Sequence, residues 1–119
     1  MKTKAVLAAL AALSQESRLA IFRYLIERGP QGSTVGSIAA ALDLPPATLS
    51  FHLKALTHAT LLVSRQEGRF IRYSASFATM NELIAYLTEN CCGGRPELCR
   101  PACVPAKARA RQSRRRITA

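Results

Sequence analysis

The sequence predicts a mainly α (α+β) protein: a winged helix-turn-helix with additional N- and C-terminal helices. Three observations predict this fold. Apolar residues recur at helical spacing in several short stretches of the first half of the chain. Two of these stretches are joined by a tight turn that ends in two prolines, which is the helix-turn-helix pattern. Two strand-like runs joined through a Glu-Gly pair then precede a last helical stretch, and this hairpin is the expected wing.

The N-terminal part of the chain predicts two helices. The first carries apolar residues at i, i+3 and i+4 spacing, namely Val6, Leu7, Leu10 and Leu13. Ser14 is the expected N-cap of the second helix. The apolar stripe of that second helix is Leu19, Phe22, Leu25 and Ile26. Gly29-Pro30 ends it, since glycine turns easily there and proline cannot continue a helix.

The stretch from Ser33 onward predicts the helix-turn-helix. Ser33 or Thr34 caps a short helix whose Ile38 and Leu42 point inward. Prolines at the turn and at the first position of the next helix suit the start of "PATLSFHLKAL". Its buried stripe at i, i+4 and i+7 is Leu49, Leu53 and Leu56.

The wing and the last helix complete the predicted order. "LLVSRQ" and "RFIRYSA" alternate like strands, and Glu67-Gly68 between them indicates a hairpin turn. A last helix is predicted to run straight into Cys91. Its apolar stripe is Phe77, Met80, Leu83, Ile84 and Leu87.

Length, hydropathy and charge limit the function. The 119 residues, 49% of them hydrophobic, suffice for one small domain. No apolar run approaches the roughly 20 residues that span a bilayer, so we expect a cytoplasmic protein with no membrane partner. The net charge of +10 lies mostly in the tail, because residues 1–90 contain nine Lys and Arg against six Asp and Glu. A basic tail attracts nucleic acid without reading sequence, or simply keeps a chain soluble.

Two motifs are specific when they occur together. They are the Thr-Leu-Ser-x-His-Leu-x-x-Leu core at 48–56 and the Glu-Gly-Arg-x-x-x-Tyr wing at 67–73. With "ALSQESRLAIFRYL" at 12–25 and the helix up to Cys92, they make the chain resemble the ArsR/SmtB family of bacterial metal-responsive repressors. The resemblance implies a homodimer whose interface is formed by the first and last helices. It also implies that operator DNA lies under the helix-turn-helix and is released when a metal or metalloid binds.

On this basis residues 1–92 are predicted to form the DNA-binding and dimerisation domain. Residues 93–119 are predicted to form a cysteine-containing loop and a basic, flexible tail. An enzyme is not expected, because the sequence shows no phosphate-binding glycine loop and no histidine near the thiols to act as a base.

The recognition helix is expected to face DNA with the side opposite its leucine stripe. At about 100° per residue, Phe51 points most directly outward, and Thr48, Ser50 and Lys54 lie around it. Phe51 is predicted to touch thymine methyl groups, and the polar residues to contact bases and phosphates; the alternative is that Phe51 covers neighbouring apolar surface. His52, also assigned to the DNA contacts, lies nearer the edge of the buried face.

The wing adds two arginines to the predicted DNA contacts. Arg69 and Arg72 fall on opposite faces of a strand, so we favour Arg69, at the turn, as the one that enters a groove. A dimer places two recognition helices one helical turn apart, which suits double-stranded operator DNA with an inverted repeat. Affinity should then fall steeply with salt.

Both sensing sites common in the family are missing. The first helix of the helix-turn-helix lies in "STVGSIAAAL", which has no thiol, and the last helix offers Glu82 and Glu89 but no histidine. All four cysteines instead lie within "NCCGGRPELCRPAC" at 90–103. This cluster is therefore the candidate sensor.

Three chemistries suit the cluster differently. Permanent disulfides are not expected in a reducing cytoplasm, although a thiol-redox switch stays open. Zn or Cd would accept four thiolates, but structural zinc sites favour cysteine pairs separated by two to four residues, and here the first two cysteines are adjacent. Trivalent arsenic or antimony needs three soft sulfurs on one side, which an adjacent pair and a third cysteine can supply.

By resemblance to arsenite-responsive members, the ligands are assigned as Cys91, Cys92 and Cys99, with Cys103 as a possible further one. The expected function is repression relieved by As(III) or Sb(III). Gathering Cys99 to the adjacent pair is expected to bend the end of the last helix and to misplace the recognition helices. A Zn/Cd-responsive repressor, a redox-responsive repressor and a non-sensing architectural DNA binder are the alternatives.

Overall fold

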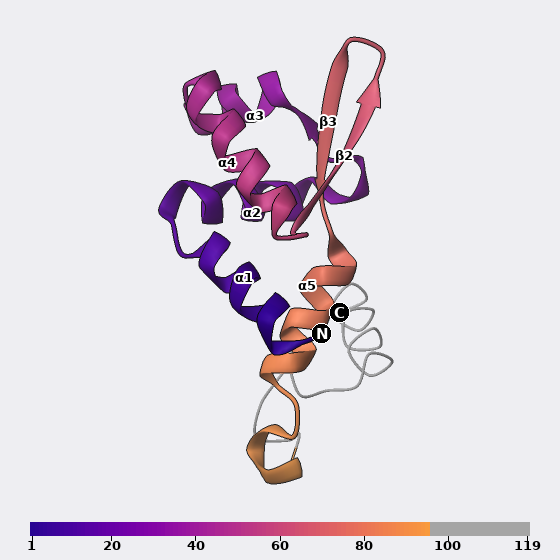
Figure 1. Ribbon diagram of the computed structural model, residues 1–119. Helices are drawn as coiled ribbons and strands as arrows, with labels where there is room; N and C mark the ends of the chain where they lie inside the picture. Colours follow the sequence, from indigo (N-terminus) through magenta and orange to yellow (C-terminus); the bar gives the residue numbers. More distant parts are fainter. Residues whose placement is uncertain (96–119) are drawn as a thin grey trace, which may run out of the picture. The chain divides into compact units, whose positions relative to one another are not determined.

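The computed structural model describes residues 1–95, which contain five α-helices and one three-stranded antiparallel sheet (Figure 1). These residues fall into two compact units, residues 1–82 and a unit that begins at Leu83, inside the last helix. The helices and the hairpin occur in the predicted order, which confirms the winged helix-turn-helix. The boundary predicted after Cys92 stays a prediction, because most of the segment 93–119 lies outside the described residues.

Helix α1 (Thr3–Leu13) packs through small side chains. Its buried residues are Val6, Ala9 and Ala12. Of the predicted apolar stripe, only Val6 is buried, while Leu7 is 61% exposed and Leu10 is 38% exposed. The helix is confirmed, but its buried face is rotated toward the alanines, and the leucines remain on the protomer surface.

The link from α1 to α2 (Glu16–Arg28) corrects the predicted cap. Ser14 ends α1, because its hydroxyl donates to the carbonyl of Ala11 at 2.7 Å. Gln15 is the N-cap of α2, and its side-chain oxygen accepts from the backbone N–H of Arg18 at 2.9 Å. That bond satisfies one of the N–H groups that the first helical turn leaves without an internal partner. The longer glutamine side chain thus takes the role predicted for serine.

Within residues 1–95, no single helix is long and apolar enough to cross a membrane. Helices α1 and α2 reach that length only as a pair that is bent by 103°.

Helix α2 buries Ile21, Phe22 and Leu25. Leu19, which was predicted in the stripe, is 44% exposed.

A short strand that the sequence did not predict follows α2. After the 3-10 turn η1 (Gly29–Gln31), β1 (Ser33–Thr34) pairs antiparallel with β3 (Phe70–Ala75). A Cβ atom at Gly32, which has a φ of 64°, would lie 1.9 Å from the carbonyl oxygen of Tyr73. The backbone therefore approaches β3 so closely that only glycine fits at this position.

The helix-turn-helix consists of α3 (Val35–Leu42) and α4 (Pro46–His58). As predicted, Thr34 caps α3, accepting from the backbone N–H of Ser37 at 3.3 Å. Pro46 begins α4, where its missing N–H costs nothing. The predicted stripe of α4 is confirmed: Leu49, Leu53 and Leu56 are at most 1% exposed. Each buried leucine contributes about 1.5–3 kcal/mol, so this stripe fixes which side of α4 faces solvent.

The wing is the hairpin of β2 (Leu62–Glu67) and β3, and it projects from the helices (Figure 1). The sheet order is β1-β3-β2. Glu67 pairs with Phe70, so the turn residues are Gly68 and Arg69, one position later than predicted. Gly68 has a φ of 60°, which suits the first central position of a two-residue hairpin turn.

Helix α5 (Phe77–Leu87) ends before the cysteines, so the prediction that it runs straight into Cys91 is wrong. The Thr88 hydroxyl donates to the carbonyl of Ile84 at 2.7 Å, and Asn90 takes a left-handed conformation with a φ of 54°. Asparagine tolerates this conformation better than most residues, and here it begins the next turn. A distorted 3-10 turn, η2 (Cys91–Gly94), follows.

Candidate functional site

The solvent face of α4 brings together the predicted polar and aromatic residues. Thr48, Ser50, Phe51 and Lys54 are all exposed, and Phe51 is 64% exposed. They share this face because the leucine stripe holds the opposite side of the helix in the core. The alternative in which Phe51 covers apolar surface of its own protomer does not fit this exposure.

Two shallow depressions flank Lys54 and His58, which line both of them. The first, of about 430 Å³, is also lined by Ser50 and Thr57 of α4 and by Tyr73 of β3. The second, of about 370 Å³, is lined instead by Phe51 and Ala55, which make it more apolar. The outer face of α4 therefore offers a hollow of mixed polarity toward the wing and a more apolar hollow beside Phe51.

Sequence reasoning missed the residues Thr57, His58 and Tyr73. His58 follows Lys54 by four residues and Phe51 by seven, so helical spacing could have placed it on the same face. Tyr73 belongs to another element, and no local pattern signals that it lies beside α4.

His52 is 8% exposed, which leaves its side chain little surface for the direct DNA contact that the sequence predicted. The Nε–H of Arg18 donates to His52 Nδ1 at 3.2 Å. Burial, and next the positive charge of Arg18, hold the pKa of the imidazole below its ordinary value. His52 is therefore a packing residue whose Nδ1 accepts from Arg18, consistent with its expected place at the edge of the buried face.

Arg18 is a second residue that the sequence did not single out. Its guanidinium carbon lies 5.8 Å from the centroid of the Phe51 ring, within the range of a cation–π contact. The rings of Phe51 and His52 meet edge to face at 5.8 Å. Arg18 on α2 thus contacts both an exposed and a buried residue of α4.

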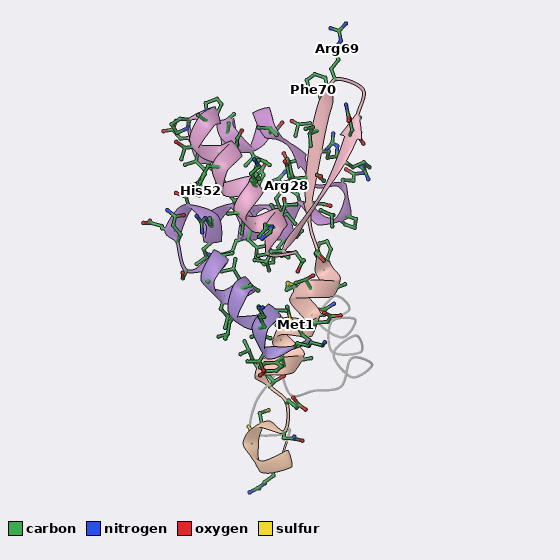
Figure 2. The ribbon with its side chains drawn as sticks, viewed as in Figure 1. Met1, Arg28, His52, Arg69 and Phe70 are labelled. Atoms are coloured by element: carbon green, nitrogen blue, oxygen red, sulfur yellow. The ribbon has the colours of Figure 1, made fainter. Side chains whose placement is uncertain are left out.

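The two wing arginines, Arg69 and Arg72, differ in the contacts that their side chains make. Arg69 lies in the turn and extends from the tip of the hairpin, away from the helices (Figure 2). Arg72 donates to Glu67 at 2.8 Å and to the carbonyl of Gln31 at 3.3 Å. Bonds from Arg72 and then from Arg65 hold the pKa of Glu67 below its usual range. Arg72 is thus engaged within its own protomer, and Arg69 is the arginine that projects.

The adjacent cysteines lie in the turn η2. Cys91 is disulfide-bonded, contrary to the expectation from the sequence, and both cysteines are half-buried. Cys92 has a φ of 56°, an uncommon conformation for a residue with a side chain. The backbone N–H of Cys91 donates to the carbonyl of Thr88 at 3.1 Å, which links the turn to the end of α5.

The predicted third ligand, Cys99, and Cys103 lie outside the described residues. Among residues 1–95, no three His, Cys, Asp or Glu side chains converge as a metal ion requires.

Comparison with known proteins identifies the family. A family model described as a helix-turn-helix domain matches residues 13–65. An ArsR-like transcriptional regulator from Rhodococcus sp. RHA1 is 32% identical, with a TM-score of 0.63, and the match covers 73% of this chain and 78% of that one. The chain belongs to the ArsR family of transcriptional regulators. Members of this family regulate transcription and are not enzymes, which confirms that part of the prediction.

Two further structures resemble this ArsR-family regulator. Reduced HlyU from Vibrio cholerae N16961 is 25% identical, with a TM-score of 0.59, over 76% of this chain and 92% of that one. Mb0332 from Mycobacterium bovis, described as a homodimeric winged helix-turn-helix DNA-binding domain, is 23% identical. Its TM-score is 0.60, over 73% of this chain and 81% of that one, and at this identity it supports the fold alone. No curated protein sequence matches the chain.

Proposed function

We propose that this ArsR-family regulator is a homodimeric repressor that releases its operator when As(III) or Sb(III) binds a three-cysteine site. The observation that carries the DNA-binding part is the solvent face of α4, with Phe51 64% exposed beside an apolar hollow. The inducer part rests on the adjacent Cys91 and Cys92, which lie in η2, the next element after α5.

Operator reading is assigned to α4 and the tip of the wing. The apolar hollow beside Phe51 suits thymine methyl groups, which project into the major groove. Thr48, Ser50 and Lys54 supply polar groups for base edges and phosphates. Arg69, which projects from the wing, supplies a further cation.

Dimerisation is assigned to exposed apolar side chains on α1 and α5. Leu7 and Leu10 on α1 are apolar side chains that their own protomer leaves in solvent. Ile84 and Leu87 on α5 are likewise 37% and 57% exposed. Burying such side chains between two copies is favourable, and the structural relative Mb0332 is described as homodimeric. A dimer spaces two α4 helices for the two halves of an inverted repeat.

The inducer site would use the thiolates of Cys91, Cys92 and Cys99. Soft sulfur ligands select a soft acceptor, and a trivalent arsenic or antimony centre takes three of them. Zn or Cd, with Cys103 as a fourth ligand, is the second choice of inducer.

Release requires that the inducer bind the DNA-free conformation more tightly, commonly by about 1–3 kcal/mol. Because α5 already ends at Leu87, unwinding at Cys91 cannot be the coupling step. The proposed route runs instead through the hydrogen bond from Cys91 to the carbonyl of Thr88, and from Thr88 to Ile84. A metalloid that reshapes the turn would alter this last part of α5, which carries the exposed Leu87.

A redox-responsive repressor is the second candidate, favoured by the disulfide at Cys91. Two thiols would lose two protons and two electrons to a peroxide, forming a disulfide and reducing hydrogen peroxide to two waters. The disulfide and the metalloid site exclude each other, because both need the sulfur of Cys91. HlyU, whose structure is described as reduced, is a relative in which the redox state was specified.

The test is fluorescence anisotropy with a duplex that the wild type enriches from a random pool. The complex, reduced with a phosphine, is titrated separately with arsenite, antimonite, zinc and cadmium, and a second sample receives hydrogen peroxide alone. Release by arsenite or antimonite supports the proposal. Release by peroxide alone, with no response to arsenite, would favour the redox candidate.

Matched serine variants assign the third ligand. Cys99→Ser should bind the duplex like the wild type but no longer respond to arsenite, whereas Cys103→Ser should respond normally. A normal response of Cys99→Ser would overturn the proposed ligand set.

A further inference from the structure

Arg18 lies on the opposite flank of α4 from the wing. Successive helix positions point about 100° apart, so Ser50, Phe51 and His52 face three directions. Ser50 shares a hollow with Tyr73 of the wing strand β3, and His52 accepts from Arg18 of α2. Phe51, between them, faces solvent. The wing and Arg18 therefore border the exposed face of the recognition helix on its two sides.

The guanidinium of Arg18 has donors to spare. It carries five N–H groups in a planar fork. One of them, on Nε, is used by His52 Nδ1 at 3.2 Å. Among the residues that the structure describes, none accepts a hydrogen bond from the two terminal nitrogens of Arg18. The contact with the Phe51 ring at 5.8 Å keeps the group next to the solvent face of α4.

We infer that Arg18 binds a DNA backbone phosphate on the side of the recognition helix opposite the wing. The inference rests on the proposed function, in which α4 enters the major groove. A groove about 12 Å wide places a phosphate strand along each flank of the inserted helix. One strand then lies toward the wing and the other lies toward Arg18. A guanidinium fork is well suited to bind phosphate oxygens through two parallel hydrogen bonds.

His52 acts here as a positioning residue. By accepting from Nε, it leaves both terminal nitrogens of Arg18 available as donors. This role needs the neutral imidazole, because a protonated ring has no acceptor at Nδ1. The Arg18–His52 pair therefore joins α2 to the DNA-binding face, and it extends that face beyond the helix-turn-helix.

The test compares Arg18→Ala with Arg23→Ala, which removes the same charge from an exposed position on the same helix. Binding to the enriched duplex is measured against salt concentration. Arg18→Ala should weaken binding roughly tenfold, the size expected for a charge-assisted hydrogen bond. It should also reduce the slope of log K on log salt by about 0.9 for each bound protomer. Arg23→Ala should change both the affinity and the salt slope much less than Arg18→Ala does.

Single methylphosphonates in the duplex then locate the contact. Each methylphosphonate neutralises one phosphate. Wild type should bind a modified duplex more weakly wherever it contacts the neutralised phosphate. In Arg18→Ala, one of these losses should vanish while the others remain, and Arg23→Ala should retain all of them. If Arg18→Ala keeps the full wild-type pattern, the inference is wrong even though operator binding stands. If wild type enriches no inverted repeat, the proposed function fails first.

Variants of His52 provide a second test that does not depend on whether Arg18→Ala folds. His52→Asn keeps an acceptor near the position of Nδ1 and should retain sensitivity at the same phosphate. His52→Leu removes the acceptor and should lose part of the sensitivity to a methylphosphonate at that phosphate. Circular dichroism checks that both variants fold. Equal behaviour of the two variants at that phosphate would exclude the positioning role.

Discussion

At the scale of single residues, the proposed base reading depends on Phe51, an aromatic ring left 64% exposed on α4. If the ring contacts a thymine methyl group, replacing that thymine with uracil should weaken wild-type binding about fourfold, since one buried methyl group contributes about 0.8 kcal/mol. Phe51→Ala should bind both duplexes equally. Val63→Ala, at another exposed apolar position, is the control and should keep the difference. A wild type indifferent to uracil at every position would refute the contact.

His52 gives a prediction about stability and pH. Burial and Arg18 lower its pKa in the folded protein, so the unfolded chain binds a proton more readily. The free energy of unfolding should therefore fall as the pH drops below about 6.5, the ordinary histidine pKa. Urea unfolding at several pH values measures this. His52→Asn cannot titrate, so its stability should fall less over the same window, and an unchanged pH dependence would contradict the assignment.

The residue scale also shows what periodicity can and cannot predict. The spacing of three leucines on α4 was enough to predict that Ser50, Phe51 and Lys54 face solvent. The bond between Arg18 and His52 joins residues 34 positions apart, and helical spacing within one element carries no information about it. His52 was consequently assigned to DNA, although its imidazole serves the contact with α2.

At the scale of elements, Gly32 is the position where the short strand β1 depends on one residue. Gly32→Ala should destabilise the protein by roughly 2–5 kcal/mol, because a Cβ atom would clash with the Tyr73 carbonyl and the backbone is left-handed. Gly36→Ala is the matched change in α3, where a Cβ atom meets nothing within 4 Å. It should stabilise by roughly 0.5–1 kcal/mol. Urea unfolding distinguishes them, and similar effects would refute the close approach.

The elements that the sequence predicted are those with a long periodic pattern, and those it missed depend on contacts with other parts of the chain. All five helices and both hairpin strands have such a pattern. Strand β1 has only two residues, and its partner β3 lies 38 residues further on in sequence, where Thr34 pairs with Arg72. The end of α5 was placed too late because the turn between Leu87 and the left-handed Asn90, which begins η2, has no periodic signal in the sequence.

At the scale of the whole molecule, the two assigned activities make opposite demands on the protein. Operator binding needs two recognition helices held at a fixed spacing, and this favours a firm dimer. Release needs a second arrangement that differs by only a few kcal/mol. Apolar residues on the surface of α1, rather than a buried stripe, are suited to forming such a dimer. A turn with left-handed residues at Asn90 and Cys92 is suited to the second, because such backbone is costly to hold and is open to rearrangement.

The proposed dimer can be tested separately from the folding of each chain. Leu7→Glu combined with Leu10→Glu changes exposed side chains, so each protomer should keep its stability within about 0.5 kcal/mol. Two charges placed in an apolar interface should nevertheless convert the dimer to monomers in sedimentation velocity. Binding to an inverted repeat should then weaken steeply, because each half-site is bound separately. Val63→Glu adds a charge at an exposed apolar position on the wing and should remain dimeric. If the α1 variant also stays dimeric, these leucines do not form the interface.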